Sequence, residues 1–297
     1  MFPPRLSYLV PLPHGGGLSL GERPLVMGVL NVTPDSFADT RRFSTESAIE
    51  AAIQMEAAGA DIIDVGGEST RPGAVPVSAE EELRRVVPVL RGLAGRVRVP
   101  LSIDTYKASV ASAAIAEGAA MVNDISALLY DADMARTIAE GRAALILMHT
   151  RGRSADMYAQ AHYGDVVQDV AAELRQRMDT AIHAGVPIER IVIDPGIGFA
   201  KRPAHSYGLL ARIAELGALL QRPVLAGPSR KSFMREALGD RPPVERDWGT
   251  AAAVTAAVLG GAHLVRVHAV AEMVQVVRVA EATRRHGRID EAGRITS

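Results

Sequence analysis

The stretch that decides the fold is Val99-Pro-Leu-Ser-Ile-Asp-Thr-Tyr-Lys-Ala-Ser-Val-Ala-Ser-Ala-Ala-Ile-Ala-Glu-Gly-Ala-Ala-Met-Val-Asn123. An apolar run ends on Asp104, an Ala-rich segment of helical length follows over residues 107–117, and Gly118 is suited to end that helix. A second apolar run then ends on Asn123. The order is strand, helix, strand, which is typical of a parallel sheet with helical connections.

The same alternation recurs along the whole chain. Eight apolar runs each finish on a polar residue: Leu25–Asn31, Ala60–Asp64, Val99–Asp104, Ala119–Asn123, Ala143–His149, Arg190–Asp194, Pro223–Ser229 and His263–His268. Amphipathic or Ala-rich stretches of helical length lie between them, including residues 44–58, 78–93, 166–184, 249–260 and 270–285. Eight repeats predict an α/β fold, a closed (β/α)8 TIM barrel over residues 25–290, with residues 1–24 as a leader or a hairpin under the barrel floor.

Composition favours a single enzyme-sized domain. The 297 residues are 48% apolar and only 4% aromatic, so Val, Ile, Leu and Ala must fill the core, as they do in barrels. The net charge of −1, with no basic stripe, argues against nucleic acid as a partner. The chain has no cysteine, which excludes disulfides and thiolate sites and fits a cytoplasmic location. No run is long enough for a membrane span, so we expect no membrane association.

Two late segments indicate a subunit interface. Residues 249–260 and 270–285 are rich in Ala and Val almost all round, which is typical of helices buried on two sides. Tight packing within one chain explains this pattern, and so does a homodimer. We favour the homodimer.

In a TIM barrel the loops at the carboxyl ends of the strands carry the chemistry, so the polar run ends are candidate site residues. Asp104, Asn123 and Asp194 would converge there, and their mutual repulsion would be costly unless a cation or a ligand supplies donors. No paired histidine spacing suggests zinc. The oxygen set suits Mg²⁺, or a heterocycle with N–H edges such as a pterin or guanine. We expect Asp124 to cap a helix instead, and His149 to be a satisfied histidine at a strand end.

Anion-binding signals surround these carboxylates. The loop Asp64-Val-Gly-Gly-Glu-Ser-Thr-Arg-Pro-Gly73 combines glycines with hydroxyl and guanidinium donors. Lys231, Arg266 and His268 follow the seventh and eighth runs, where barrels often bind phosphate. This pattern predicts an anionic leaving group beside a polar heterocycle. The loop after Asn31 holds Asp35, Phe37 and Asp39, and it is explained equally by a mobile lid and by an ordinary Pro-rich turn.

Seven motifs, in order, carry a family resemblance. They are Met27-Gly-Val-Leu-Asn-Val-Thr-Pro-Asp-Ser-Phe37, Gly66-Gly-Glu-Ser-Thr-Arg-Pro-Gly-Ala74, Ser102-Ile-Asp-Thr-Tyr-Lys107, Asn123-Asp-Ile125, Asp194-Pro-Gly-Ile-Gly-Phe199, Ser229-Arg-Lys-Ser-Phe233 and Arg266-Val-His268. Together they resemble the dihydropteroate synthase family, from about residue 25 to about residue 270. The resemblance implies a pterin-binding barrel that joins 4-aminobenzoate to 6-hydroxymethyl-7,8-dihydropterin diphosphate and releases pyrophosphate, in folate biosynthesis.

The resemblance also implies roles for individual residues. Asp104, Asn123, Asp194 and Lys231 would hold the pterin, and Met148 would also contact substrate. Asn31 would lie beside the cofactor Mg²⁺, while Arg266 and His268 would hold the pyrophosphate. The aminobenzoate side would be shaped by Thr70, Arg71, Pro72, Phe199 and Ser232. Among all of these, the catalytic set would be Asp39, which closes over the site, with Lys231, Arg266 and His268.

The chain departs from the family pattern in its loops. Thr40-Arg41-Arg42 stands where the family has a Gly pair, Ala269 where it has Asp, and Ser206 or Tyr207 near an expected Asn. These departures keep open a non-catalytic or altered-specificity pterin-binding paralogue. A methyltetrahydrofolate:corrinoid methyltransferase is a further alternative, although it has no use for the loop at residues 66–73.

Overall fold

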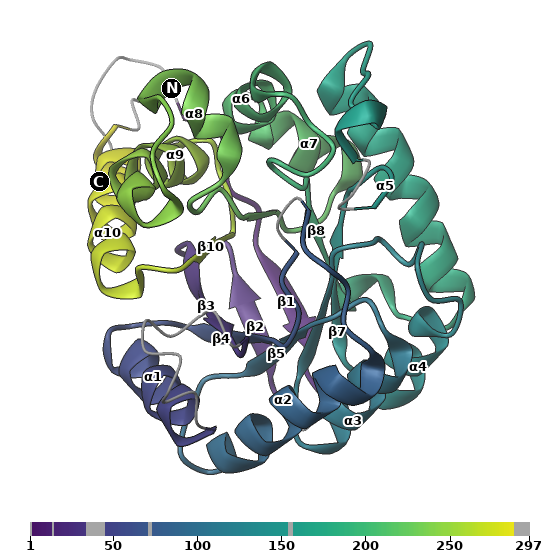
Figure 1. Cartoon of the computed structure of the whole chain (residues 1–297). Helices are drawn as coiled ribbons and strands as arrows, with labels where there is room; N and C mark the ends of the chain where they lie inside the picture. Colours follow the sequence, from purple (N-terminus) through teal and green to yellow (C-terminus); the bar gives the residue numbers. More distant parts are fainter. Residues whose placement is uncertain (1, 14, 34–44, 71–72, 154–156, 288–297) are drawn as a thin grey trace.

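The structure is a ring of parallel strands surrounded by helices (Figure 1). This computed structural model describes residues 2–13, 15–33, 45–70, 73–153 and 157–287. Within them the ring order is β8-β7-β6-β5-β4-β3-β10-β9. The strands are β3 (Leu25–Asn31), β4 (Ile62–Gly66), β5 (Leu101–Asp104), β6 (Met121–Asp124), β7 (Ala144–Met148), β8 (Ile191–Asp194), β9 (Leu225–Ala226) and β10 (Leu264–Val267). The (β/α)8 barrel predicted from the sequence is confirmed.

The ring closes between β8 and β9. An isolated parallel bridge pairs Ile193 with Val224, and the Ile193 N–H donates to the Pro223 carbonyl oxygen at 3.0 Å. β9 is only two residues long, shorter than the predicted run 223–229, because Gly227 and Pro228 follow and proline has no N–H for the ladder. Closure leaves no sheet edge open, which stabilises a barrel built from such short strands.

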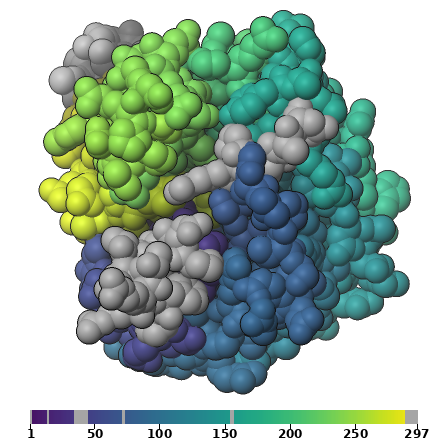
Figure 2. Space-filling model, in the orientation of Figure 1, coloured from purple at the N-terminus to yellow at the C-terminus, as the bar shows by residue number. Residues whose placement is uncertain are grey.

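The helices cover the outside of the ring (Figure 1). They are α1 (Thr45–Ala57), α2 (Ala79–Leu93), α3 (Ala108–Ala116), α4 (Met134–Gly141), α5 (Val166–His183), α6 (Pro203–Ala211), α7 (Ile213–Leu220), α8 (Arg235–Leu238), α9 (Asp247–Leu259) and α10 (Val270–His286). Short 3-10 turns are η1 (Met157–Gln160), η2 (Ile188–Arg190), η3 (Ser232–Met234) and η4 (Pro243–Arg246). Figure 2 shows the yellow surface of α10 beside the light-green segment that precedes it. Of the described helices, none has the length and apolar character needed to cross a membrane.

Local signals set several helix ends. The Ser78 hydroxyl accepts a hydrogen bond from the Glu81 N–H at 3.1 Å, which satisfies one of the unpaired donors at the start of α2. Gly118 follows α3 with a φ of 100°, a left-handed conformation that glycine adopts without strain. The end at Gly118 is as the sequence predicts.

An antiparallel hairpin lies across the amino-terminal end of the barrel. Its strands β1 (Tyr8–Pro11) and β2 (Gly17–Leu20) appear in purple in the middle of the ring in Figure 1. Val10 and Leu20 are buried in one apolar cluster with Met27 of β3 and other residues at the bottom of the barrel. The hairpin therefore fills the floor of the barrel, and the opposite end holds the polar strand ends.

One strand boundary differs from the prediction in a way that matters for the site. The second strand runs from Ile62 to Gly66, two residues later than the predicted run 60–64. Ala60 belongs to the turn that ends α1 and not to the strand, because its N–H donates to the Met55 carbonyl oxygen. Gly66 pairs with Asn31 and Asp104 in the neighbouring strands, so Asp64 lies inside the strand, below the mouth of the barrel.

Candidate functional site

A buried ion cluster fills the upper barrel. The Arg266 guanidinium donates from Nε to Asp64 Oδ2 and from Nη2 to Asp104 Oδ2, each at 2.6 Å. The Asn123 amide donates to the same Asp64 oxygen at 2.8 Å. Asp64 is completely buried and Asp104 nearly so. The cation that the convergent carboxylates require is therefore Arg266, which contributes from the eighth barrel strand.

Part of this cluster has unused hydrogen-bonding capacity. Among the described residues, the buried Oδ1 atoms of Asp64, Asp104 and Asn123 accept no hydrogen bond. Burial raises the pKa of Asp104 to about 7, against the lowering effect of Arg266. Buried acceptors without donors are costly, so this arrangement suits a ligand that brings N–H groups to the barrel mouth.

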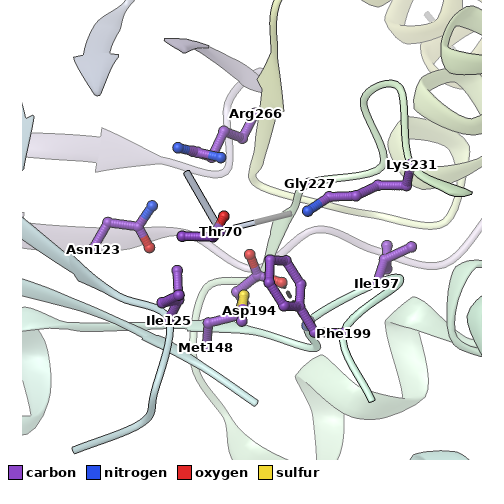
Figure 3. Close-up of a pocket in the computed structure, with 11 residues that line it drawn as sticks. Thr70, Asn123, Ile125, Met148, Asp194, Ile197, Phe199, Gly227, Lys231 and Arg266 are labelled. Atoms are coloured by element: carbon purple, nitrogen blue, oxygen red, sulfur yellow. Dashed lines mark hydrogen bonds between the residues drawn. The ribbon is translucent and has the colours of Figure 1, made fainter. Parts of the chain in front are cut away.

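A pocket opens above the cluster. Its lining, shown in Figure 3, is Thr70, Asn123, Ile125, Met148, Asp194, Gly196, Ile197, Phe199, Gly227, Lys231 and Arg266. These residues lie in or after six different barrel strands, so the pocket exists only when the ring is closed. Seven predicted substrate-binding residues are brought together here: Thr70, Asn123, Met148, Asp194, Phe199, Lys231 and Arg266.

Asp194 is the ionisable group on the β8 side of the pocket. Its Oδ1 accepts the Gly196 N–H at 2.7 Å, while burial raises its pKa to about 6. Lys231 and Arg266 both act in the opposite direction and favour the carboxylate. The Lys231 ammonium lies 3.8 Å from the centre of the Phe199 ring, a cation–π geometry. Figure 3 shows Lys231 extending across this ring toward Asp194.

The loop that carries Thr70 is held from behind by a second ion cluster. Glu68 accepts from Lys107 Nζ at 2.5 Å and from the Tyr106 hydroxyl at 2.6 Å. Lys107 also pairs with the buried Glu82 of α2. Burial raises the pKa of Glu82, although the bond to Lys107 opposes this. The cluster fixes the start of the loop, and so it fixes the wall of the pocket at Thr70.

Four predicted site residues lie near the pocket without lining it. Asp104 is behind Arg266, as described above. Ser232 begins η3, with its Oγ 3.1 Å from the Tyr158 hydroxyl. His268 follows β10, with Nδ1 2.9 Å from Ser229 Oγ. Asn31 ends β3 at the mouth and is partly exposed.

Other predicted residues lie outside the part of the chain that the structure describes. Asp39, together with Asp35 and Phe37, falls in residues 34–44, and Arg71 and Pro72 form the gap after Thr70. The Thr40–Arg42 departure from the family pattern is in the first of these segments. Their roles stay predictions.

Asp64 was a candidate only as the end of a run, with no role assigned to it, and Lys201 is missing from the predicted set. A carboxylate inside the apolar sequence Ile62-Ile63-Asp64-Val65 is the signal that could have identified Asp64.

The prediction for Asp124 was wrong in detail. It is buried and closes the turn after β6, where it accepts the N–H groups of Ser126 and Leu128, and it caps no helix. His149 is buried with both ring nitrogens in contact with partners, as expected.

The site offers little to a metal on its own. Within the described residues, no three His, Cys, Asp or Glu side chains group as a metal site. The Asn31 amide oxygen at the mouth is a hard donor that suits Mg²⁺. Mg²⁺ is commonly held by one or two protein oxygens together with substrate phosphates, so Asn31 fits an ion that arrives with a diphosphate.

The comparisons with known proteins agree with this geometry. The family described as "Pterin binding enzyme" matches residues 27–268. The chain is 45% identical to a dihydropteroate synthase of Synechocystis sp. over 95% of this chain and 96% of that protein. It is 42% identical to the Xanthomonas albilineans dihydropteroate synthase solved with 4-aminobenzoic acid, with a TM-score of 0.87 over 94% of this chain and 99% of that one. The same bacterial enzyme in complex with 7,8-dihydropteroate gives 41% identity and a TM-score of 0.79, over 89% of this chain and 94% of that one.

Proposed function

This chain belongs to the pterin-binding enzyme family, its relatives being dihydropteroate synthases, and on that premise we propose the reaction that its site performs. The enzyme condenses 6-hydroxymethyl-7,8-dihydropterin diphosphate with 4-aminobenzoate to give 7,8-dihydropteroate and pyrophosphate. The observation that carries the assignment is the pocket over the Asp64–Arg266–Asp104 cluster, whose buried acceptors match the N–H edge of a pterin. The relatives favour this reaction over transfer of a methyl group to a corrinoid.

Recognition of the pterin depends on acceptors that stay ionised. A carboxylate accepts two parallel N–H bonds from a 2-amino-4-oxopyrimidine edge, and an amide both donates and accepts. Asp194 and Asn123 line the pocket and provide these groups, with Asp104 behind Arg266. A ligand that lacks the N–H edge would leave these buried groups unpaired, which costs about 1–3 kcal/mol for each group.

The chemical step exchanges one bond for another. The C–O bond between the pterin methylene and the diphosphate breaks, and pyrophosphate leaves with the electron pair. The positive charge that develops on the methylene spreads into the pterin ring, where Asp104 and Asp194 stabilise it. The amine of 4-aminobenzoate then forms the C–N bond and releases a proton to solvent. Arg266 and His268 hold the departing pyrophosphate in this scheme.

Mg²⁺ would be held by Asn31 and the diphosphate oxygens, where it would offset negative charge on the leaving group. Lys231 holds the pterin in this proposal, while Phe199 and Thr70 shape the other side of the pocket. We place 4-aminobenzoate there, with Arg71, Pro72 and Ser232 completing its site. Asp39 closes over the pterin from the first loop, and closure would exclude water, which otherwise competes with the amine.

The protein acts as a homodimer in this proposal, and we place it in the cytoplasm. α9 and α10 form a groove lined by Thr255, Leu259, Gln275, Val276, Val279, Ala280 and Thr283. Val279 is 68% exposed within this largely apolar groove, which supports burial of the groove by a second copy. Sedimentation of the wild type and of Val279→Glu tests this, with a monomeric wild type as the contrary result.

Turnover tests the proposed function directly. The purified protein is mixed with the dihydropterin diphosphate, 4-aminobenzoate and Mg²⁺, and dihydropteroate is measured, with each component omitted in turn. We expect product only when all three are present. Binding of the pterin without product would instead establish a non-catalytic paralogue and point to Thr40–Arg42 and Ala269 as the cause.

A further inference from the structure

A third buried cluster lies behind the loop at residues 195–200, which follows Asp194 and carries Phe199. Lys201 is 1% exposed, and its Nζ donates to the Phe199 carbonyl oxygen at 2.9 Å. The same Nζ lies 2.9 Å from His149 Nδ1. A lysine buried so completely is rare unless it is paired. Its partners link it to the wall of the pocket.

The hydrogen bonds assign the tautomer of the histidine. His149 Nε2 lies 3.0 Å from Glu173 Oε2 of α5, and an ionised carboxylate only accepts. Nε2 therefore carries the proton and Nδ1 accepts from Lys201. Burial lowers the pKa of His149 to about 4, in agreement with a neutral ring. Arg151 completes the chain of contacts, since it pairs with Glu173 on the outer side.

The loop at residues 195–200 has a conformation that these contacts must maintain. Gly196 has a φ of 66°, and a Cβ at this position would collide with the His149 carbonyl oxygen. Ala200 has a φ of 50°, which is uncommon for a residue other than glycine and persists only where surrounding contacts hold it. Tyr163 donates to the Ala200 carbonyl oxygen at 3.0 Å, and Lys201 donates to that of Phe199.

We propose that Lys201 is a positioning residue for this site, which shapes the loop that presents Phe199 to the pocket and places a buried positive charge behind Asp194. The proposal rests on the proposed function, because it assigns the loop to the aminobenzoate side of the same pocket. Lys201 acts through Asp194 and Phe199, and it is absent from the pocket lining given above.

The electrostatics support this assignment. Burial lowers the pKa of Lys201 to about 7, while Asp194 and Glu173 act to keep it charged. In return, the Lys201 charge favours the carboxylate form of Asp194, in addition to Lys231 and Arg266. The charged and titratable groups that act on Lys201 and its partners are His149, Arg151, His162, Tyr163, Asp169, Glu173, Asp194, Arg202, His205, Lys231 and Arg266.

The test uses the full-length protein and the pH dependence of pterin binding. 6-Hydroxymethyl-7,8-dihydropterin is titrated calorimetrically across the ionisation of Asp194 in the wild type, in Lys201→Met and in Lys201→Arg. Loss of the Lys201 charge raises the pKa of Asp194, so we expect the acid limb of binding to move to higher pH by roughly one unit in Lys201→Met. Lys201→Arg keeps the charge and should restore the wild-type midpoint.

Turnover supplies the second readout. We expect Lys201→Met to lower kcat/KM for 4-aminobenzoate about 10- to 100-fold, because Phe199 is displaced, with a rise in KM. Tyr163→Phe removes a hydrogen bond to the same loop without changing charge, and it should keep the wild-type pH midpoint. This matched control separates electrostatics from loss of loop contacts.

Glu173→Gln provides a variant at the partly exposed end of the cluster, for use if Lys201→Met does not fold. It removes charge that keeps Lys201 protonated, so the midpoint should again move to higher pH. A wild-type midpoint in folded Lys201→Met, together with a KM for 4-aminobenzoate within about twofold of the wild type, overturns the proposal, and so does a wild-type midpoint in Glu173→Gln where Lys201→Met does not fold. A wild type that binds the pterin but forms no product refutes the proposed function instead, and the binding titration still tests Lys201.

Discussion

Replacement of Arg266 by methionine tests the ion cluster at the centre of the barrel. Methionine is unbranched and fills similar space, so the main loss is the guanidinium. Arg266 bonds to Asp64 and to Asp104 at 2.6 Å each, and both carboxylates are buried. Breaking a buried pair by removal of one partner costs about 3–5 kcal/mol, which is a large share of the 5–15 kcal/mol that stabilises a typical domain.

The loss of stability in Arg266→Met should depend on pH. The titration of Asp104 decides whether the loss is larger at low or at high pH. Burial already raises its pKa to about 7, and Arg266 is the main group that lowers it. Without Arg266 the pKa of Asp104 in the folded state rises further above its unfolded value. When the pKa of a carboxyl is higher in the folded state, its contribution to stability is present at low pH. That contribution is lost as the pH rises through the pKa of the folded state. If the folded pKa rises from about 7 to about 9, the additional loss between pH 6 and pH 8 is about 1.4 kcal/mol, and it reaches about 2–3 kcal/mol only above about pH 9.

Urea denaturation of the wild type and of Arg266→Met at about pH 6 and about pH 8 measures this difference. Titrating groups on which Arg266 does not act, such as Lys201, cancel in the comparison, whereas the pKa of Asp194 also rises when Arg266 is removed and adds a loss of the same sign. The variant should lose more stability at the higher pH, and addition of Asp104→Asn should recover part of it because a neutral amide leaves no uncompensated buried charge at this position. An equal loss at both pH values, or a loss below about 1 kcal/mol, would refute the reasoning.

Three further outcomes follow from the same structure. Asp194→Asn should weaken pterin binding about 10- to 100-fold by calorimetry, because a buried N–H of the ligand loses its acceptor; unchanged affinity would remove Asp194 from the pterin site. Removal of Mg²⁺ with EDTA should abolish product formation yet leave binding of the pterin without its diphosphate intact, and equal loss of both would contradict the role of Asn31. Leu20→Ala in the floor hairpin should cost about 2–5 kcal/mol in urea denaturation with unchanged kcat in the folded protein; a fall in kcat would count against a purely structural floor.

The fold could be predicted because its signals are local. A strand of a parallel barrel is buried on both sides, so each one reads as a short apolar run, and helical segments of suitable length lie between. Closure and the right-handed connections then follow from general rules, and so does the end of the barrel where chemistry occurs. That is why Asn123, Asp194, Lys231 and Arg266 could be assigned to one mouth from their positions alone.

What the sequence by itself determined is therefore the barrel and most of the strand ends from which the site is built, whereas it left residues 1–24 open between a leader and a floor hairpin. The tertiary structure alone decided the partners within that set. Arg266 binds Asp64 and Asp104 from 202 and 162 residues away, and Lys201 meets His149 from 52 residues away. Such pairs depend on how far each strand is shifted along its neighbours and how deep each side chain lies in the ring. A two-residue shift of β4 is enough to place Asp64 within the barrel, and no local pattern encodes that depth.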